Sequence, residues 1–533
     1  MKTWHGVAAV AGAAMIGFGA WAIHVTTMPR HTIYVDAGGC NTPITVIDTD
    51  VDKPLGSVVM LHGLSANRRV MNYLGDELAF DGGLRIYALD LAGHGDNEAP
   101  FTFHRAEDCA AAAVAKLIEN GAIDPKDAVY VGHSMGGTIA IRLADREPLA
   151  GTVAISPGPT ELPKRMPSNL LVFTGQFDPP FLKRAAKEIE TAAGGDRSSV
   201  DDFMQQRAFL LDYVRGATHT SQIHSQQVED DTRDWILNSL EAAAGDAEGV
   251  VDWKERAGWT AEKAPPTVRN ALGKVWYAAI RNGALWGAIG LLLIYPLMFA
   301  LGIRFSGGKP EEENAARVPN APSWKLVLFE GLVFGFAGVL LLTIFQPMKF
   351  VHLFTGGYLA SLMLIVGIFV AAANWKLFRE NFHWELGVTV AAAALALAVF
   401  LSFGAWLNWE VDDAWMNAPR WLRFFEILPA AWLFFYGEEL LLGPVGTGGK
   451  RAKRFGLFLL FRLLLLAACA FAVFEFDSGQ ILIPLLVFPL AFLSVLTRYG
   501  SDSLRRRMGS AAAAALFGAI LAAWFVAAVF PLT

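Results

Sequence analysis

One short stretch constrains the fold of this chain more than any other. Residues 128–137 read Ala-Val-Tyr-Val-Gly-His-Ser-Met-Gly-Gly, and a helix-forming stretch runs from Thr138 to Arg146. The first half has the β-branched and aromatic composition of a buried parallel strand. Glycine stands two places before and two places after Ser134, where larger side chains would clash in a tight turn. The pattern predicts a nucleophile elbow, in which Ser134 stands above a sheet edge beside the first N–H groups of a helix.

Hydrophobic residues are unevenly distributed along the 533-residue chain. They make up 54% of the sequence and the mean hydropathy is +0.37, which is too apolar for a wholly soluble protein. Residues 31 to about 250 carry an ordinary density of charge, whereas apolar blocks of near membrane-spanning length follow from residue 283. The net charge of −6 and the lack of a basic, aromatic-interleaved patch argue against a nucleic acid partner.

Between residues 31 and 245, predicted strands alternate with predicted helices. An antiparallel pair is expected first, around Gly38 and Gly39, and an amphipathic helix from Asp231 to Ala244 is expected last. The remaining pattern predicts an α/β fold with a doubly wound, mainly parallel sheet covered on both faces. Besides the elbow strand, the predicted strands are residues 32–35, 45–48, 57–61, 85–90, 152–156, 170–174 and 210–214.

Four motifs in this region follow one another in a known order. His62-Gly63 comes after the third strand, Gly93-His94-Gly95 after the fourth, and then come the elbow, an acid and a histidine. On these motifs residues 31–245 resemble the α/β-hydrolases, close to the branch of the monoacylglycerol lipases and serine aminopeptidases. The resemblance implies a serine hydrolase that uses no metal and no organic cofactor.

A serine hydroxyl becomes a good nucleophile only when a histidine takes its proton, and that histidine needs a carboxylate to fix its tautomer. In this fold the acid follows the seventh strand and the histidine follows the eighth. The chain has Asp178 and His219 at these places, so the expected catalytic residues are Ser134, Asp178 and His219. The alternatives are Asp201 or Asp202 as the acid and His224 as the histidine.

The expected oxyanion hole consists of two backbone N–H groups, those of Leu64 and Met135. His133 is expected to pack beside the nucleophile and His94 to shape a loop. About a dozen residues, Pro157 to Asn169, separate the sixth and seventh strands, where this family usually inserts a lid. An open mouth covered by the membrane surface or by outer loops such as residues 408–421 is therefore expected, which favours an amphiphilic substrate.

The rest of the chain is predicted to be membrane-bound. Residues 1–30 contain an apolar segment, 7–25, that we interpret as a signal anchor, with cleavage after Ala20-Trp21-Ala22 as the alternative. Residues 246–282 are predicted to form a linker, with a candidate interfacial helix over Val268 to Ile280. Residues 283–533 are predicted to form a membrane domain of about eight helices: 283–303, 326–345, 354–373, 386–407, 422–443, 455–474, 480–497 and 510–530.

Basic residues collect in alternate loops of this membrane domain. They occur in the loop 304–325, then at Lys376 and Arg379, at 450–454, and at Arg498 and 505–507. The positive-inside rule places these loops in the cytoplasm and the hydrolase domain outside, and an anchor entering from Lys2 predicts the same side. A multi-pass cell (inner) membrane location with the hydrolase domain extracytoplasmic is expected.

Cysteines and intramembrane charges leave two questions open. Cys40 and Cys109 could pair in an oxidising compartment, but two buried free thiols are the preferred expectation. Five ionisable residues lie in or at the ends of apolar segments, and a structural Glu–Arg pair or a polar cavity is expected there. Gly437-Glu438-Glu439 faintly resembles the CAAX-processing proteases, but no histidine follows His383 to bind a metal. The five residues are Glu330, Glu426, Glu438, Glu439 and Arg462.

Together these patterns favour a membrane-embedded serine hydrolase that cleaves an acyl ester of a small molecule or lipid. One alternative is acyl transfer by the same residues to an acceptor hydroxyl. The other is a transporter or lipid-handling membrane protein with a non-catalytic hydrolase-like domain. The sequence leaves the oligomeric state open.

Overall fold

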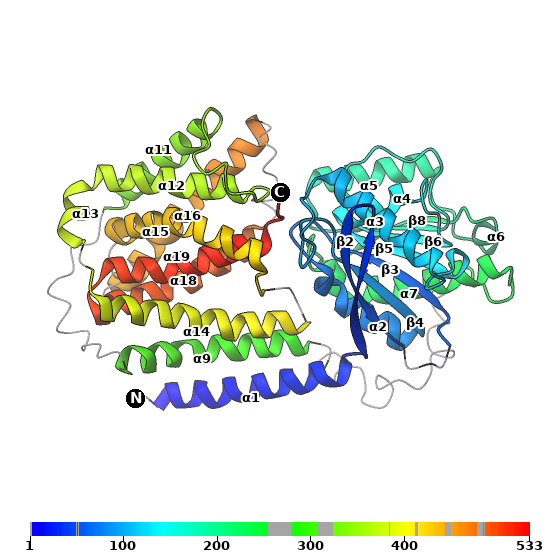
Figure 1. Ribbon diagram of the computed structural model, residues 1–533, viewed down its shortest axis with the longest axis horizontal. Coiled ribbons are helices and arrows are strands. Elements are labelled where there is room, and N and C mark those ends of the chain that lie inside the picture. The colour runs from blue at the N-terminus through cyan, green and yellow to red at the C-terminus, as the bar shows by residue number, and fades with distance from the viewer. Residues whose placement is uncertain are drawn as a thin grey trace. The chain divides into compact units, whose positions relative to one another are not determined.

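The computed structural model describes residues 3–49, 51, 53–253, 280, 282–305, 323–382, 384–410, 414–442, 449–476, 483 and 486–533. The chain forms two compact units (Figure 1). The sheet unit comprises residues 17–287 and 406–413, together with Thr533, and the helical unit comprises residues 1–16, 288–405 and 414–532.

Eight strands of the sheet unit form one sheet, in the order β1-β2-β4-β3-β5-β6-β7-β8. β2 pairs antiparallel with β1 and with β4, and every other pair of neighbours is parallel. This is the predicted α/β fold with a mainly parallel sheet. The strands are β1 (Arg30–Ala37), β2 (Cys40–Ile47), β3 (Gly56–Leu61), β4 (Leu84–Leu89), β5 (Ala128–His133), β6 (Gly151–Ile155), β7 (Leu170–Gly175) and β8 (Phe209–Val214).

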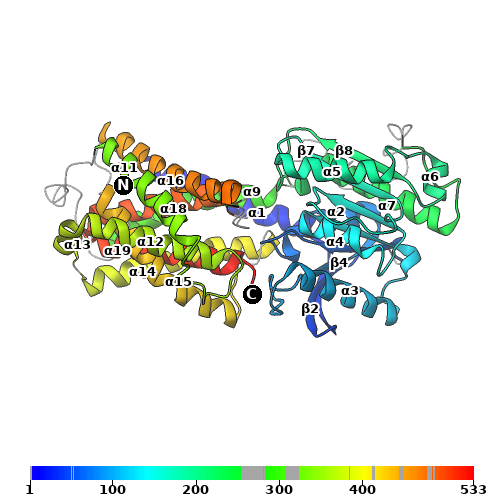
Figure 2. The ribbon, with the colours of Figure 1, turned by 90° about the horizontal axis from the view of Figure 1, so that it is seen from above.

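Helices cover both faces of this sheet because side chains alternate along its buried strands. Val129 and Val131 of β5 belong to a core with α2 (Asn72–Gly82) and α7 (Gln226–Ala244). Leu170 and Val172 of β7 point the other way, into a core with α4 (Met135–Leu143) and α5 (Pro180–Ala193). α3 (Phe103–Glu119) packs against α4, β1 and β2, and Figure 2 shows these helices from above.

The expectation of two free thiols in the sheet unit was wrong. Cys40 and Cys109 form a disulfide, with their Cα atoms 5.7 Å apart. The pairing is possible because α3 packs against the β1–β2 hairpin and brings Cys109 to the start of β2. The sequence separation of 69 residues hides this contact.

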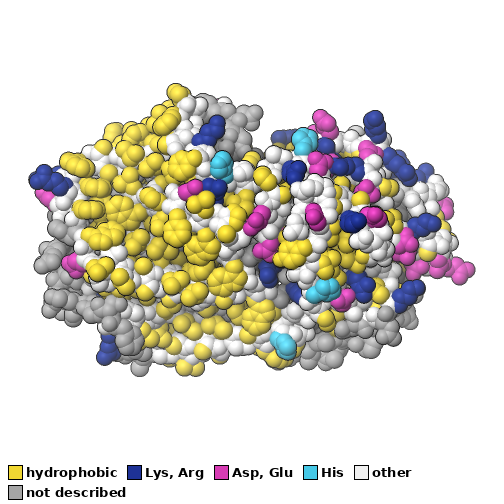
Figure 3. Space-filling view, in the orientation of Figure 1, with side chains coloured by type: hydrophobic (Ala, Val, Ile, Leu, Met, Phe, Trp, Pro, Cys, Tyr) yellow, Lys and Arg dark blue, Asp and Glu magenta, His cyan; other side chains and the backbone are white. Residues whose placement is uncertain are grey.

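The helical unit is built from long apolar helices, and hydrophobic side chains cover much of its visible face in Figure 3. α15 packs against α12 and α19, and α11 packs against α16. The described helices beyond residue 282 are α9 (Gly283–Phe305), α11 (Trp324–Leu342), α12 (Gly356–Ala373), α13 (Trp375–Asn381), α14 (Leu386–Glu410), α15 (Ala418–Leu442), α16 (Gly449–Phe476), α18 (Val487–Met508) and α19 (Ala511–Val529). The first residues of α9 and the last residues of α14 belong to the sheet unit.

Within the described residues, 7 helices are long and apolar enough to cross a membrane. They correspond to the predicted anchor, found in α1 (Thr3–Thr26), and to six of the eight predicted segments. The predicted segment 422–443 corresponds to α15. This helix contains more charged residues than the seven candidate spans and is not one of them. The segment 480–497 and the candidate interfacial helix 268–280 lie partly or almost wholly outside the described residues, so the predicted domain boundaries and the count of eight stay predictions.

Candidate active site

Ser134 stands at the turn between β5 and α4, with φ 54° and ψ −117°. Such a backbone conformation is strained for a residue with a side chain and persists only where the surroundings enforce it. A Cβ atom on Gly132 would overlap the carbonyl group of Gly136, and one on Gly136 would overlap the carbonyl group of Leu61. The two glycines of the motif are therefore required by the close approach of β3, β5 and α4.

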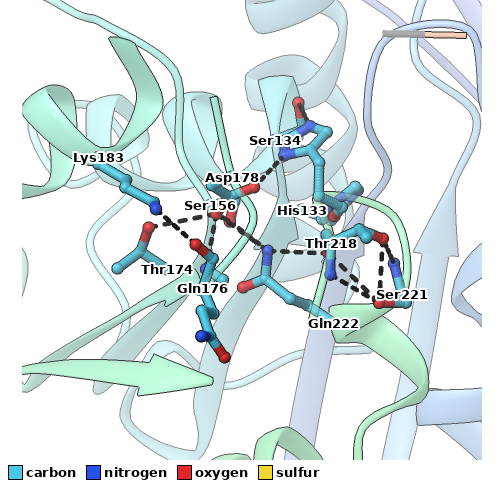
Figure 4. Close-up of polar contacts among 12 residues, drawn as sticks. His133, Ser134, Ser156, Thr174, Gln176, Asp178, Lys183, Thr218, Ser221 and Gln222 are labelled. Carbon is cyan, nitrogen blue, oxygen red and sulfur yellow. Dashed lines mark hydrogen bonds and ion pairs between the residues drawn. The ribbon is translucent and has the colours of Figure 1, made fainter. Parts of the chain in front are cut away.

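His219 and Asp178 reach Ser134 from the loops that follow β8 and β7. His219 Nε2 lies 2.9 Å from Ser134 Oγ, and His219 Nδ1 lies 3.1 Å from Asp178 Oδ1. Ser134 and Asp178 are drawn in Figure 4. The side chain of Asp178 is fully buried, and that of His219 is 12% exposed. The structure thus brings together the three residues that the sequence singled out.

The alternative residues take part in other contacts. Asp202 closes a capping box with Ser199 at the start of the short helix α6 (Val200–Met204), and its carboxylate also accepts from Arg207. Asp201 lies in the first turn of the same helix. The His224 ring packs edge-on against Tyr73, with the ring centroids 5.0 Å apart.

Asp178 is held by a set of donors that the sequence did not reveal. Its Oδ2 accepts hydrogen bonds from the Gly175 N–H at 2.6 Å and Ser156 Oγ at 2.5 Å. Thr174 Oγ1 at 3.2 Å and Gln222 Nε2 at 3.1 Å lie around the same oxygen, and Gln222 also donates to Ser156 (Figure 4). Burial opposes ionisation, but the hydrogen bonds from His219, Ser156 and Gly175 outweigh it and lower the pKa of Asp178 to about 2.

The other histidines near the elbow have structural contacts. His133 Nε2 donates to the backbone carbonyl of His219 at 2.9 Å, which ties the elbow to the loop after β8. Burial, assisted by the neighbouring His219, lowers the pKa of His133 to about 3, so its ring is neutral at pH 7. His94 Nε2 accepts from the Ser65 N–H at 3.2 Å, and His62 Nε2 accepts from the Leu91 N–H at 3.0 Å. His62 and His94 thereby shape the loops after β3 and β4.

Two backbone segments border the Ser134 side chain. Met135 is the first residue of α4, where N–H groups lack partners within the helix. A Cβ atom on Gly63 would lie 3.2 Å from Ser134 Cβ, so the loop that carries Leu64 packs directly against the serine. Among the described residues, no group of three or more His, Cys, Asp or Glu side chains could hold a metal ion.

The mouth of the site has no inserted lid between β6 and β7. Residues 156–169, all of them described, contain neither helix nor strand. Phe177, next to Asp178, has a side chain that is 62% exposed. An exposed aromatic ring beside a polar site is suited to contact with an apolar substrate or surface.

Comparison with known proteins agrees with this fold. The family model described as "Alpha/beta hydrolase family" matches residues 58–294. A Mycobacterium phage D29 protein named as a non-heme haloperoxidase is 34% identical over 119 residues, which are 22% of this chain and 40% of that protein. A pimeloyl-(acyl-carrier protein) methyl ester esterase of Yersinia pseudotuberculosis is 28% identical over 164 residues, 29% of this chain and 59% of that protein.

Among solved structures, an esterase of Pyrococcus furiosus is 16% identical with a TM-score of 0.34, covering 40% of this chain and 94% of that one. The matched stretch spans between 40% and 59% of the two curated relatives' own length. The family match covers strands β3 to β8, and this part of the chain has the α/β-hydrolase fold.

Proposed function

We propose that this protein is a membrane-embedded serine hydrolase that cleaves carboxylic esters. The observation that carries the proposal is the hydrogen-bonded line from Ser134 Oγ through His219 to Asp178, with distances of 2.9 and 3.1 Å. A nucleophile, a base and an orienting carboxylate in this geometry are what acyl transfer to serine requires. The esterase among the relatives, named for a methyl ester, supports the same class of bond.

In the proposed mechanism His219 Nε2 takes the proton of Ser134 as its Oγ attacks the carbonyl carbon of the ester. The N–H groups of Leu64 and Met135 stabilise the oxyanion that forms. His219 then gives the proton to the leaving alcohol, and an acyl-enzyme remains. Water attacks the acyl-enzyme with the same histidine as base, and the acid product and free Ser134 result. Asp178 stays ionised throughout and holds the Nδ1–H of His219.

An amphiphilic ester on the outer side of the membrane is the substrate class that we favour. The open mouth, the exposed Phe177 and the apolar helices of the same chain support an amphiphile. The disulfide between Cys40 and Cys109 supports an oxidising compartment such as a bacterial periplasm. The alternation of basic loops supports the same orientation.

The test is labelling of the purified full-length protein with a fluorophosphonate, together with hydrolysis of p-nitrophenyl butyrate. Ser134→Ala should abolish labelling and lower kcat/KM by about 10⁴-fold or more, because triad members act as a unit. His219→Ala should behave alike, whereas His224→Ala should keep most activity. Ser225→Ala is the matched control, because this helix-capping position makes no side-chain hydrogen bond. Activity of Ser134→Ala within tenfold of wild type would refute the nucleophile.

A further inference from the structure

The helical unit contains an apolar cavity of about 240 Å³. Its walls come from the five helices α12, α15, α16, α18 and α19. Most of the lining is aliphatic or aromatic, as at Leu362, Leu466 and Val526. A dry protein cavity of roughly 150 Å³ is already large enough to bind benzene. This cavity therefore has room for a stretch of hydrocarbon chain.

Arg462 is the one charged residue among the described residues that line the cavity. Its Nη2 donates to Glu438 Oε2 at 2.5 Å, and its guanidinium lies 4.7 Å from the ring centre of Phe434 and 5.6 Å from that of Phe458. Nε has no hydrogen-bond partner, and Nη1 makes no hydrogen bond to any described residue. The side chain is 21% exposed. A guanidinium with spare donors at an apolar cavity is suited to an oxygen acid.

The surrounding charge also favours an anion. Glu438 pairs with Arg462, and Glu439 pairs with Arg498 at 2.9 Å. Arg505, buried on the same helix as Arg498, forms no ion pair with a described residue and reaches Asn381 Oδ1 at 3.4 Å. Asp502 lies 3.9 Å from Arg498 and pairs with Arg506 at 2.9 Å. These three acids and four arginines leave an excess of positive charge in a region of low dielectric, which attracts an anionic group.

We propose that this cavity binds a single-chain amphiphile with an anionic oxygen head, either a fatty acid carboxylate or a lysolipid phosphate. The head lies at Arg462 and the hydrocarbon tail runs along α16 toward Cys469. The two positions are seven residues apart in sequence, which corresponds to about 10 Å of helix. This site is separate from Ser134 and does not depend on the proposed esterase activity.

The experiment uses the full-length Ser134→Ala protein in phosphatidylcholine nanodiscs, so that hydrolysis cannot affect the result. A palmitate analogue with a diazirine in mid-chain is the photoactivatable probe. We expect saturable labelling that mass spectrometry maps to peptides of α12, α16 and α18 that line the cavity. Palmitate or lysophosphatidate should compete at least tenfold better than methyl palmitate, which has the same chain without the charge. Whichever anion competes better identifies the source of the head.

Paired variants test the head and the cavity separately. The double variant Arg462→Gln/Glu438→Gln removes both charges at once, and it should lower saturable labelling at least tenfold. Its matched control is Arg423→Gln/Glu426→Gln, which removes an ion pair of 2.7 Å on α15 outside the cavity. Ala522→Trp should fill the cavity and abolish labelling, whereas Leu401→Trp on the exposed side of α14 should not.

Cys469 gives a readout that needs no variant at the cavity. It is the free cysteine of the chain and it lines the cavity. Palmitate should slow its modification by N-ethylmaleimide at least fivefold, and methyl palmitate should not. Unsaturable labelling, equal competition by methyl palmitate, or equal labelling of the Arg462→Gln/Glu438→Gln and control double variants would each overturn the proposal. Equal modification of Cys469 with and without palmitate would do the same.

Discussion

Replacing Asp178 by asparagine changes one oxygen for an NH₂ group and tests the proposed triad closely. Among the described residues, every hydrogen-bond partner of this carboxylate is a donor: His219 on Oδ1, and Gly175, Ser156, Thr174 and Gln222 around Oδ2. An amide has a single acceptor oxygen, so its NH₂ group must point at donors on one side, where no hydrogen bond can form unless a donor gives up its proton. If the amide oxygen stays with Gly175 and Ser156, the NH₂ faces His219 Nδ1. The histidine must then carry its proton on Nε2, where it cannot accept the proton of Ser134.

Two magnitudes follow from this geometry. The wrong tautomer should lower kcat by about 10⁴-fold, as for a triad whose geometry is otherwise intact. The pKa of Asp178 is lowered from 3.8 to about 2, which corresponds to roughly 2 kcal/mol in favour of the ionised form. In the native protein this contribution is fully present above pH 3.8 and is lost as the pH falls through 2. Asp178→Asn should therefore lower the free energy of unfolding by about 2 kcal/mol at pH 7.

The assay compares Asp178→Asn with Asp201→Asn, an alternative acid in α6, by p-nitrophenyl butyrate hydrolysis and by thermal unfolding. Asp201→Asn should keep kcat within twofold of wild type. A kcat of Asp178→Asn within tenfold of wild type would show that Asp178 does not orient His219. A larger loss in Asp201→Asn would transfer the role to that residue.

Two further predictions concern acid stability and orientation. The pKa of His133 is lowered from 6.5 to about 3, so below pH 6.5 the unfolded state binds a proton that the native state excludes, and the free energy of unfolding should fall by about 2 kcal/mol between pH 7 and 5. Chemical denaturation of His133→Gln should show a smaller fall than wild type, and a larger fall would disprove the neutral buried ring. In a Cys469→Ala background, a membrane-impermeant maleimide should label Arg197→Cys in spheroplasts but label Lys453→Cys only after permeabilisation; the reverse pattern would place the hydrolase domain in the cytoplasm.

The part of the site that could be predicted depends on local sequence. Gly132 and Gly136 are fixed by a turn of five residues, and the runs on either side fix a buried strand and a helix. Asp178 and His219 could be placed because they follow predicted strands at the same sheet edge. Their positions come from strand order, which the alternation of elements reveals.

The donors around Asp178 could not be predicted in the same way. Ser156 directly follows β6, Thr174 belongs to β7, and Gln222 begins the short 3₁₀ helix Gln222–His224 after β8. Each is an ordinary polar residue in its own segment, and the three come together only because β6, β7 and β8 pair in parallel. The disulfide was missed for a related reason, because Cys40 and Cys109 meet only where α3 packs on the hairpin.

The charged residues of the apolar helices also have partners that are distant in the sequence. The sequence predicted a Glu–Arg pair or a polar cavity without deciding the partners. Glu438 pairs with Arg462, 24 residues away, and Glu439 pairs with Arg498, 59 residues away. Glu330 instead lies by the Asn374 amide at 3.2 Å. Because an unpaired charge among apolar helices costs several kcal/mol, the packing of α15 against its neighbours has to satisfy these groups. The charges that make α15 a poor membrane span by composition therefore favour a position inside the helical unit, with α12 and α19 packed against it.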